Sequence, residues 1–153
     1  MDPILKKLNF KEHPAIYVLQ APADLQPLIN TWSKETSVKN KLGKTPVNFA
    51  MAFCITQQDV NSIAEKLLPL ADGDAVIWFC YPKGTSKKYK CEFNRDNGWA
   101  ALGALDWEPV RMVAIDDDWS ALRFRKTNFI KTMSRSSAIS AKGKERIADK
   151  KKR

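Results

Sequence analysis

The sequence predicts a three-layer α/β fold in which helices cover both faces of a five-stranded, mostly parallel sheet. Apolar strand-like runs alternate with helix-like segments along the first two thirds of the chain, as right-handed β-α-β crossovers require. Only a few residues separate the last two strand-like runs, which permits an antiparallel hairpin and no crossover. With 153 residues, 44% of them hydrophobic, the chain is long enough for one domain with a buried core.

The first predicted strand covers residues 15–20 and the first predicted helix covers residues 23–32. The strand is rich in β-branched and aromatic residues and has a proline on each side. The helix has apolar residues at helical spacing, and Pro27 fits within its first turn. Residues 33–46 are polar and rich in lysine, so they are predicted to be a connection.

The second and third predicted strands, at residues 47–55 and 75–81, are almost wholly apolar. Continuous apolar strands of this kind are typical of a parallel sheet that is covered on both faces. The helix between them begins at Thr56, and Asp59 stands three residues later as in a capping box. Pro69 ends this helix.

A long loop at residues 82–98 leads to a short predicted helix at 99–107, with Asp96 or Asn97 as its N-cap. The fourth and fifth strands follow at residues 108–116 and 119–126.

Asp116, Asp117 and Asp118 lie at the turn of this hairpin. Aspartate favours turns because its side chain accepts hydrogen bonds from nearby backbone N–H groups. Neighbouring residues of an extended chain point to opposite faces, so three consecutive aspartates do not converge on one ion. We therefore expect a turn here, and no metal site in the chain.

The formal net charge is +9, and most of it lies at the end of the chain. Eight cations and two acids stand among residues 132–153, which have no apolar period. The sequence predicts one domain over residues 1–131 and a disordered basic tail over 132–153. Such a tail either increases solubility or contacts nucleic-acid phosphates without sequence preference. The cations predicted to make such contacts are Lys142, Lys144, Arg146, Lys150, Lys151, Lys152 and Arg153.

The expected location is the cytoplasm, because the chain shows no apolar run of the ~18 residues that a membrane helix needs and no apolar signal core at its start. Cys54, Cys80 and Cys91 are an odd number of cysteines without CxxC spacing. Cys54 and Cys80 end apolar strand-like runs and are expected to be small buried residues. A disulfide framework or a zinc site is not expected.

The loop at residues 82–98 is the predicted site for an anionic ligand. It leaves the carboxyl end of a strand and enters a helix, which is where α/β sheets bind ligands and where helix termini attract anions. The alternative is a solvated lysine-rich loop that keeps the protein soluble. The predicted binding residues supply positive charge or hydrogen-bond donors and are Lys83, Gly84, Thr85, Ser86, Lys87, Lys88, Arg95 and Arg123.

Arg123 belongs to this set because the last strand carries cations in its middle. Arg123 and Arg125 share one face of the strand, and an interior strand cannot leave them unpaired. They are expected to reach the end of the sheet or to meet acids such as Asp116, Asp117 and Asp118.

Catalytic residues are not predicted. His13 is the only histidine, and it precedes the first strand, so a Ser–His or Cys–His pair would have to use it. The sequence has no GxSxG, Walker A or GxGxxG pattern. No cofactor is predicted.

Two stretches, AVIWFCYPKGTSK (75–87) and VRMVAIDDDWSALRFRK (110–126), resemble a family of small bacterial proteins whose domain has no assigned function. The whole topology resembles the second half of the class I methyltransferase fold, in which the final strand inserts beside the central strands. This resemblance implies a Rossmann-like sheet with the five strands in the order 1-2-3-5-4 and the last strand antiparallel to its neighbours. That fold binds S-adenosylmethionine at a glycine-rich turn after its first strand, whereas the corresponding turn here, QAPADL, has no glycine.

The function predicted from these features is a non-catalytic binding module, with a degenerate methyltransferase-like core that holds an anionic ligand or a protein partner at the loop 82–98. One alternative is a divergent enzyme that depends on S-adenosylmethionine or a nucleotide. Another is a nucleic-acid accessory protein that binds through the basic tail.

Overall fold

The computed structural model describes residues 2–94 and 96–130 of the chain. Arg95 and the predicted tail at residues 132–153, with its seven candidate nucleic-acid-binding cations, lie outside the described residues. Among the described residues, no helix is long and apolar enough to cross a membrane.

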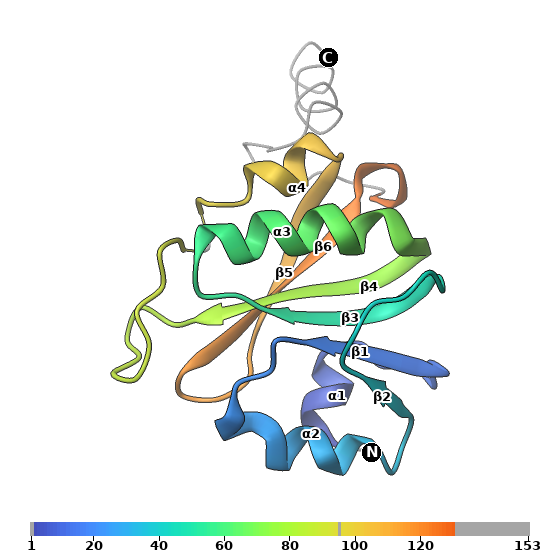
Figure 1. Ribbon diagram of the computed structural model, residues 1–153, viewed down its shortest axis with the longest axis horizontal. Helices are drawn as coiled ribbons and strands as arrows, with labels where there is room; N and C mark the ends of the chain where they lie inside the picture. The colour runs from blue at the N-terminus through green and yellow to red at the C-terminus, as the bar shows by residue number, and fades with distance from the viewer. Residues whose placement is uncertain (1, 95, 131–153) are drawn as a thin grey trace.

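A six-stranded mixed sheet forms the centre of the fold (Figure 1), with the strand order β2-β1-β3-β4-β6-β5. Strands β2, β1, β3 and β4 are parallel, and β6 is antiparallel to both β4 and β5. The strands are β1 (Ala15–Leu19), β2 (Ser37–Lys39), β3 (Val47–Phe53), β4 (Ala71–Pro82), β5 (Trp107–Ala114) and β6 (Trp119–Lys126).

The five strands predicted from the sequence are present, and they lie in the predicted order relative to one another. The predicted count of five is wrong, because β2 adds a sixth strand at the edge beside β1. This strand has only three residues, and two of them are exposed, so it has no apolar alternation to distinguish it from a polar connection. Its one inward-facing residue, Val38, pairs with Ile16 of β1.

Helices cover both faces of the sheet, as the three-layer prediction requires. Figure 1 shows α3 and α4 on one side of the sheet and α1 and α2 on the other. The helices are α1 (Pro3–Lys7), α2 (Gln26–Trp32), α3 (Gln57–Leu67) and α4 (Ala100–Ala104). Short 3-10 turns precede α2 at Ala23–Leu25, follow α3 at Leu68–Leu70 and follow β6 at Thr127–Phe129. Helix α1 was not predicted, because its five residues are too few for a helical period.

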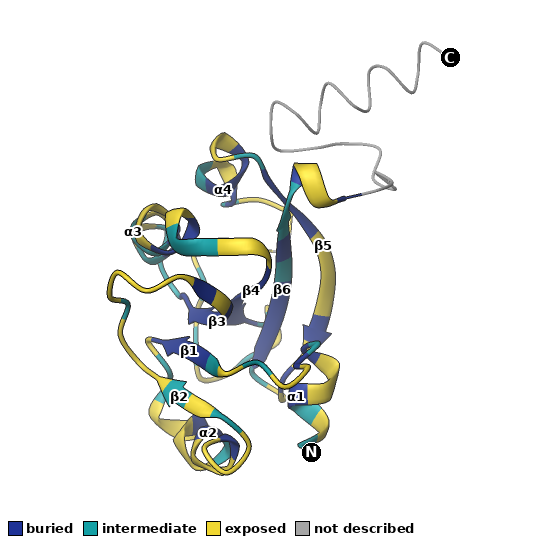
Figure 2. Ribbon diagram, turned by 90° about the vertical axis from the view of Figure 1, so that its right-hand side faces the viewer, coloured by how far each residue is buried: buried dark blue, intermediate teal, exposed yellow. Residues whose placement is uncertain are grey.

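The core has two halves, one on each face of the sheet (Figure 2). Strand residues alternate between them, because successive side chains of a strand point to opposite faces. On the side of α3 and α4, buried residues such as Leu67 and Phe79 form one cluster. On the side of α1 and α2, Leu5, Trp32 and Trp78 belong to the other.

The predicted start of α3 is confirmed. Thr56 accepts a hydrogen bond from the backbone N–H of Asp59, and Asp59 accepts one from the N–H of Thr56 at 3.1 Å, which completes a capping box. A further N–H, that of Ile55, donates to the same carboxylate at 3.0 Å. Burial acts to raise the pKa of Asp59, but hydrogen bonds from these N–H groups and from the side chains of Gln20 and Thr56 outweigh it and lower the pKa.

Replacing Asp59 by alanine is expected to lower the free energy of unfolding by about 1–2 kcal/mol at pH 7. The lowered pKa means that the folded state favours the charged carboxylate, so this contribution is present above the ordinary value of 3.8 and is lost as pH falls below it. Urea unfolding of both proteins at pH 7 and at low pH measures the difference. Glu65→Gln, at an exposed position of the same helix, is the control. A difference that does not shrink at low pH would contradict the assignment.

The predicted N-cap of α4 is wrong. The helix begins at Ala100, its N-cap is Trp99, and no side chain caps it. Asn97 instead belongs to a tight turn, in which the side chain of Asn94 accepts hydrogen bonds from the N–H groups of Asp96 and Asn97. Asn and Asp satisfy turns as readily as caps, so the sequence alone did not distinguish the two.

The turn predicted between the last two strands is confirmed. One carboxylate oxygen of Asp116 accepts hydrogen bonds from the N–H groups of Asp118, at 2.8 Å, and Trp119, at 2.7 Å.

In β5 the pairing with β6 shifts register between Pro109 and Arg111, as at a β-bulge.

Candidate anion-binding site

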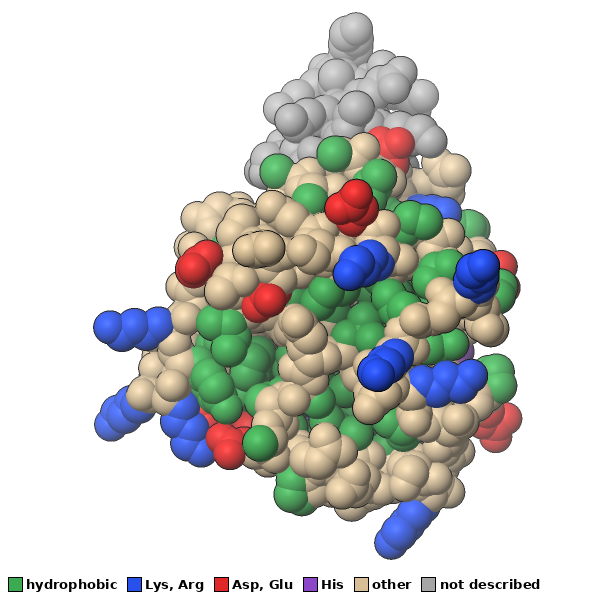
Figure 3. All heavy atoms as spheres, in the orientation of Figure 1, with side chains coloured by type: hydrophobic (Ala, Val, Ile, Leu, Met, Phe, Trp, Pro, Cys, Tyr) green, Lys and Arg blue, Asp and Glu red, His purple; other side chains and the backbone are tan. Residues whose placement is uncertain are grey.

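The candidate site lies at the edge of the sheet where the parallel strands β1, β3 and β4 end. The carboxyl ends of neighbouring parallel strands meet at one edge, and α/β proteins bind ligands there. The loop that follows β4 crosses this edge. In Figure 3, cationic side chains project at the left of the molecule, where Figure 1 shows this loop. The exposed lysines of the loop are Lys87, Lys88 and Lys90.

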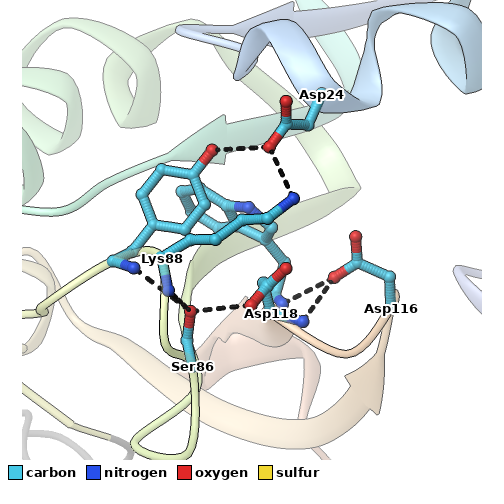
Figure 4. A network of polar contacts seen from close by, with 7 residues as sticks. Asp24, Ser86, Lys88, Asp116 and Asp118 are labelled. Atoms are coloured by element: carbon cyan, nitrogen blue, oxygen red, sulfur yellow. Dashed lines mark hydrogen bonds and ion pairs between the residues drawn. The ribbon is translucent and has the colours of Figure 1, made fainter.

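Ser86 ties the loop to the turn between β5 and β6 (Figure 4). Its hydroxyl donates a hydrogen bond to a carboxylate oxygen of Asp118 at 2.8 Å and accepts bonds from the N–H groups of Lys88 and Tyr89. The N–H of Lys83 donates to the backbone carbonyl of Asp118 at 2.8 Å. The acidic turn therefore fixes the conformation of the loop from Lys83 to Tyr89.

Lys88 and Tyr89 connect the loop to the segment that follows β1. The ammonium group of Lys88 and the hydroxyl of Tyr89 both donate to the same oxygen of Asp24, at 3.2 and 3.3 Å (Figure 4). The hydrogen bond and the charge of Asp24 raise the pKa of Lys88. Desolvation and the same carboxylate raise the pKa of Tyr89. Two donors of the loop thus converge on one carboxylate.

An unpartnered donor lies next to these groups. The ring of Tyr89 packs against the ring of Trp119, with 5.1 Å between the ring centroids. Trp119 is only 2% exposed, and its indole Nε1 has no hydrogen-bond partner among the described residues. A buried N–H without a partner is unfavourable, so an acceptor atom from a ligand would stabilise this position.

Other donors at this edge are bonded to the chain's own acceptors. Gln20, which follows β1 with a positive φ of 57°, donates its side-chain amide to the carbonyl of Phe53 at the end of β3. The N–H of Gln57 at the start of α3 donates to the carboxylate of Glu92 at 3.0 Å. The gap between the ends of β1 and β3 is thus bridged by a side chain, and the start of α3 already holds an anion.

The structure brings some predicted site residues together and separates others. Ser86 and Lys88 belong to one polar network. Gly84, Thr85 and Lys87 are exposed, and the side chains of Thr85 and Lys87 form no hydrogen bond among the described residues. Arg95 lies outside the described residues. Arg123 lies apart from the loop, since it pairs with Trp78 in the middle of β4, whereas the loop leaves β4 at Pro82.

Arg125 meets an acid, as expected of an arginine on an interior strand, but this acid is not one of the aspartates of the turn. Its guanidinium group donates to both carboxylate oxygens of Asp74, at 3.0 and 2.6 Å, and not to the aspartates of the turn. Because β6 runs antiparallel to β4, Arg125 lies at the far end of β6 from the turn, near the beginning of β4.

A groove of about 710 Å³ adjoins the candidate site, between α2 and the ends of β1 and β2. Its volume lies in the range typical of small-molecule sites. Val18, Ile29 and Val38 supply its apolar lining. The polar lining consists of Gln20, Gln26, Asn30, Ser33, Lys39, Asn40 and Lys41. This groove was not predicted, because residues 33–46 are mostly polar and were interpreted as a connection. The apolar residues Val38 and Leu42 within that run were the available signal, and Val38 lines the groove.

Two of the three cysteines are buried, and His13 lies at the opposite end of β1 from the candidate site. Burial is the main cause that raises the pKa of Cys80 and of Cys54, and both thiols are buried as predicted. His13 packs against Phe10 and Phe49 beside the beginning of β1, and desolvation and Lys11 lower its pKa. Within residues 2–94 and 96–130, no three His, Cys, Asp or Glu side chains form a group that would hold a metal ion.

Comparison with known proteins adds evidence about the fold. No family model and no curated protein matches the sequence, so the resemblance to a family of small bacterial proteins stays a prediction. The fold is similar to that of the pyocyanin biosynthetic protein PhzM, with a TM-score of 0.55 and 8% identity over 81% of this chain and 53% of that one. A protein described as a type 11 methyltransferase from Sulfolobus solfataricus gives a TM-score of 0.51 and 6% identity, over 87% and 95% of the two chains.

At such low identity the likeness shows the fold alone. The chain spans about half the length of PhzM. It has a methyltransferase-like, Rossmann-like α/β fold with a six-stranded mixed sheet.

Proposed function

We propose that this protein is a non-catalytic binding module that holds a small anionic ligand at the loop 82–98, with the uncharged part of the ligand in the adjoining groove. The observation that carries the proposal is the convergence of Lys88 and Tyr89 on one oxygen of Asp24. A carboxylate of the chain itself occupies a position where two donors meet. A carboxylate or phosphate of a ligand offers the same acceptor atoms.

The exchange of Asp24 for a ligand anion has a small energetic cost. Lys88 and Asp24 are 61% and 54% exposed at their side chains, and exposed ion pairs contribute little to stability. The neighbouring indole of Trp119 provides a further donor that lacks a partner among the described residues. A ligand that satisfies it gains a hydrogen bond that Asp24 does not provide.

The groove gives the ligand a place to extend. Ala21 and Gln26 line the groove on either side of Asp24 in the sequence, so the segment from β1 to α2 contributes to both features. Amide side chains and an apolar floor are the lining that small polar molecules require. Protonated thiols and a histidine at the opposite end of β1 favour a binding function over a chemical one.

A ligand screen by thermal unfolding tests the proposal. Inorganic phosphate, pyrophosphate, a dicarboxylate, adenine nucleotides and S-adenosylhomocysteine are added separately to the full chain. A compound at 100 times its dissociation constant stabilises the folded state by about 2.7 kcal/mol. We expect at least one anion to raise the melting temperature, and Lys88→Gln to weaken its binding at least about fivefold.

Two further variants sharpen this test. Asp24→Asn removes the competing carboxylate and is expected to strengthen binding of the same anion. Lys66→Gln removes one exposed charge from α3, on the opposite face from α2, and should leave binding unchanged. Equal affinities for the protein and for Lys88→Gln would contradict the site. Stabilisation by S-adenosylhomocysteine that survives Lys88→Gln would favour the alternative of a divergent enzyme.

A further inference from the structure

A row of three arginines lies on the sheet, away from the loop 82–98. Arg111 of β5 and Arg123 of β6 are directly opposite each other in the antiparallel register. Arg125 follows two residues later on β6. Residues opposite each other in such a pair share a face, as do residues two apart in a strand. All three side chains therefore lie on the side of the sheet that carries α1 and α2.

The helices on that side leave this part of the sheet open. Val113 and Ala121, two pairs further along the hairpin, are buried in the same cluster as Leu5 of α1. Beyond them Arg111 is exposed and Arg123 is half-buried. Figure 2 shows α1 near the carboxyl end of β5, and no described helix over the exposed middle of that strand.

The row carries more positive charge than its contacts neutralise. Arg125 forms an ion pair with Asp74, and one of its nitrogens also donates to the carbonyl of Phe129 at 2.8 Å. Within residues 2–94 and 96–130, neither Arg111 nor Arg123 forms a salt bridge. The Nε of Arg123 is buried without a hydrogen-bond partner among these residues. Burial and the charges of Arg125 and Arg111 lower the pKa of Arg123, against the opposing effect of Asp74.

A row of guanidinium groups, two of them without a salt bridge among the described residues, matches a chain of phosphates. Guanidinium presents its N–H groups in a planar fork that binds phosphate oxygens in pairs, and a bound phosphate would satisfy the Nε of Arg123. Phe129 is 38% exposed and adjoins the row through its carbonyl. An exposed aromatic ring is a platform on which an unpaired base stacks.

The chain beyond the described residues adds to the same charge. The backbone carbonyl of Phe129 contacts Arg125, and Ile130 is the last described residue. The sequence from residue 132 onward contains eight cations and two acids. Together with the arginine row, this excess of positive charge in the chain is complementary to a long polyanion rather than to a single acidic side chain.

We infer that the arginine row Arg111–Arg123–Arg125 binds the phosphate backbone of nucleic acid. This interaction surface lies on a different part of the sheet from the proposed anion site and does not depend on it. The row positions the backbone on the folded domain, and the contacts are independent of base sequence.

Fluorescence anisotropy of a labelled oligonucleotide, as a single strand and as a duplex, tests this inference with the full chain between 50 and 200 mM salt. Arg111→Gln removes an exposed charge, and Arg123→Met keeps the apolar stem of a half-buried one. Each is expected to weaken binding roughly threefold or more and to reduce the salt slope by about 1. Lys66→Gln removes an equal charge from α3 and should leave the salt slope unchanged. Phe129→Ala should weaken binding of the single strand more than binding of the duplex.

Melting temperatures of the variants establish that they are folded, and Arg111→Gln at an exposed position keeps the test valid if Arg123→Met is unstable. The inference is overturned if both arginine variants bind like Lys66→Gln while a variant with Lys150, Lys151 and Lys152 replaced by glutamine loses binding. That result would assign binding to the terminal cations alone. Equal competition by poly-glutamate would also overturn it, in favour of an acidic protein partner.

Discussion

Replacement of Trp78 by alanine is expected to lower the free energy of unfolding by about 3–5 kcal/mol. Trp78 of β4 is fully buried, and its indole donates a hydrogen bond to the carbonyl of Leu8 at 2.9 Å. The substitution leaves a large cavity and an unpaired carbonyl, and it removes the bond that holds the end of α1 on the sheet. Chemical unfolding followed by far-ultraviolet circular dichroism measures the loss.

Trp78→Phe is the matched control for this experiment. It keeps an aromatic ring in the core but removes the donor to Leu8, so an intermediate loss is expected. An alanine variant within about 1 kcal/mol of the original protein would show that the core collapses around the missing ring, contrary to its packed arrangement.

The second large effect is expected at Gly98, where alanine should lower the free energy of unfolding by about 2–4 kcal/mol. Gly98 has a positive φ of 92°, and a Cβ atom there would lie 2.5 Å from the Cβ of Phe93 and 3.0 Å from the side-chain oxygen of Gln57. Both neighbours are constrained. Phe93 is buried against Trp99, and the amide of Gln57 donates to the carbonyl of Gly98 at 2.8 Å.

Gly84→Ala provides the control, because it lies in the same loop and a Cβ there meets no atom within 4 Å. Its effect on stability should be small. Thermal unfolding of both variants measures the contrast. Similar melting temperatures would mean that the segment from Phe93 to Trp99 rearranges freely, which its buried aromatic rings oppose.

Local sequence patterns predicted most of the fold. Apolar runs identified the strands from β3 onward, and Thr56 with Asp59 identified the start of α3, because these signals act between residues close in the sequence. The patterns failed where tertiary contacts decide the structure. Val38 forms a strand only because β1 is beside it, and α1 is too short to be stable without its packing on the sheet.

The candidate site was predicted in part for the same reason. The position of the loop after β4 and its donors, Ser86 and Lys88, follow from the sequence. Their acceptors do not, because Asp118 is 32 residues and Asp24 is 64 residues away along the chain. Arg123 was grouped with the loop on its charge alone, and the strand pairing separates them.

The two edge strands of the sheet, β2 and β5, also affect the tendency of the protein to aggregate at high concentration. The unpaired backbone N–H and C=O groups of an exposed edge strand can form hydrogen bonds with a strand of a second molecule, which is one cause of aggregation. At one border β2 offers only three residues. At the other edge, formed by β5, Pro109 has no N–H group to donate to a further strand. The register shift beside Pro109 interrupts the hydrogen-bond ladder between β5 and β6, and the positive charge of Arg111 repels the same residue of a second molecule. Neither border therefore provides the long, flat template on which fibrils grow.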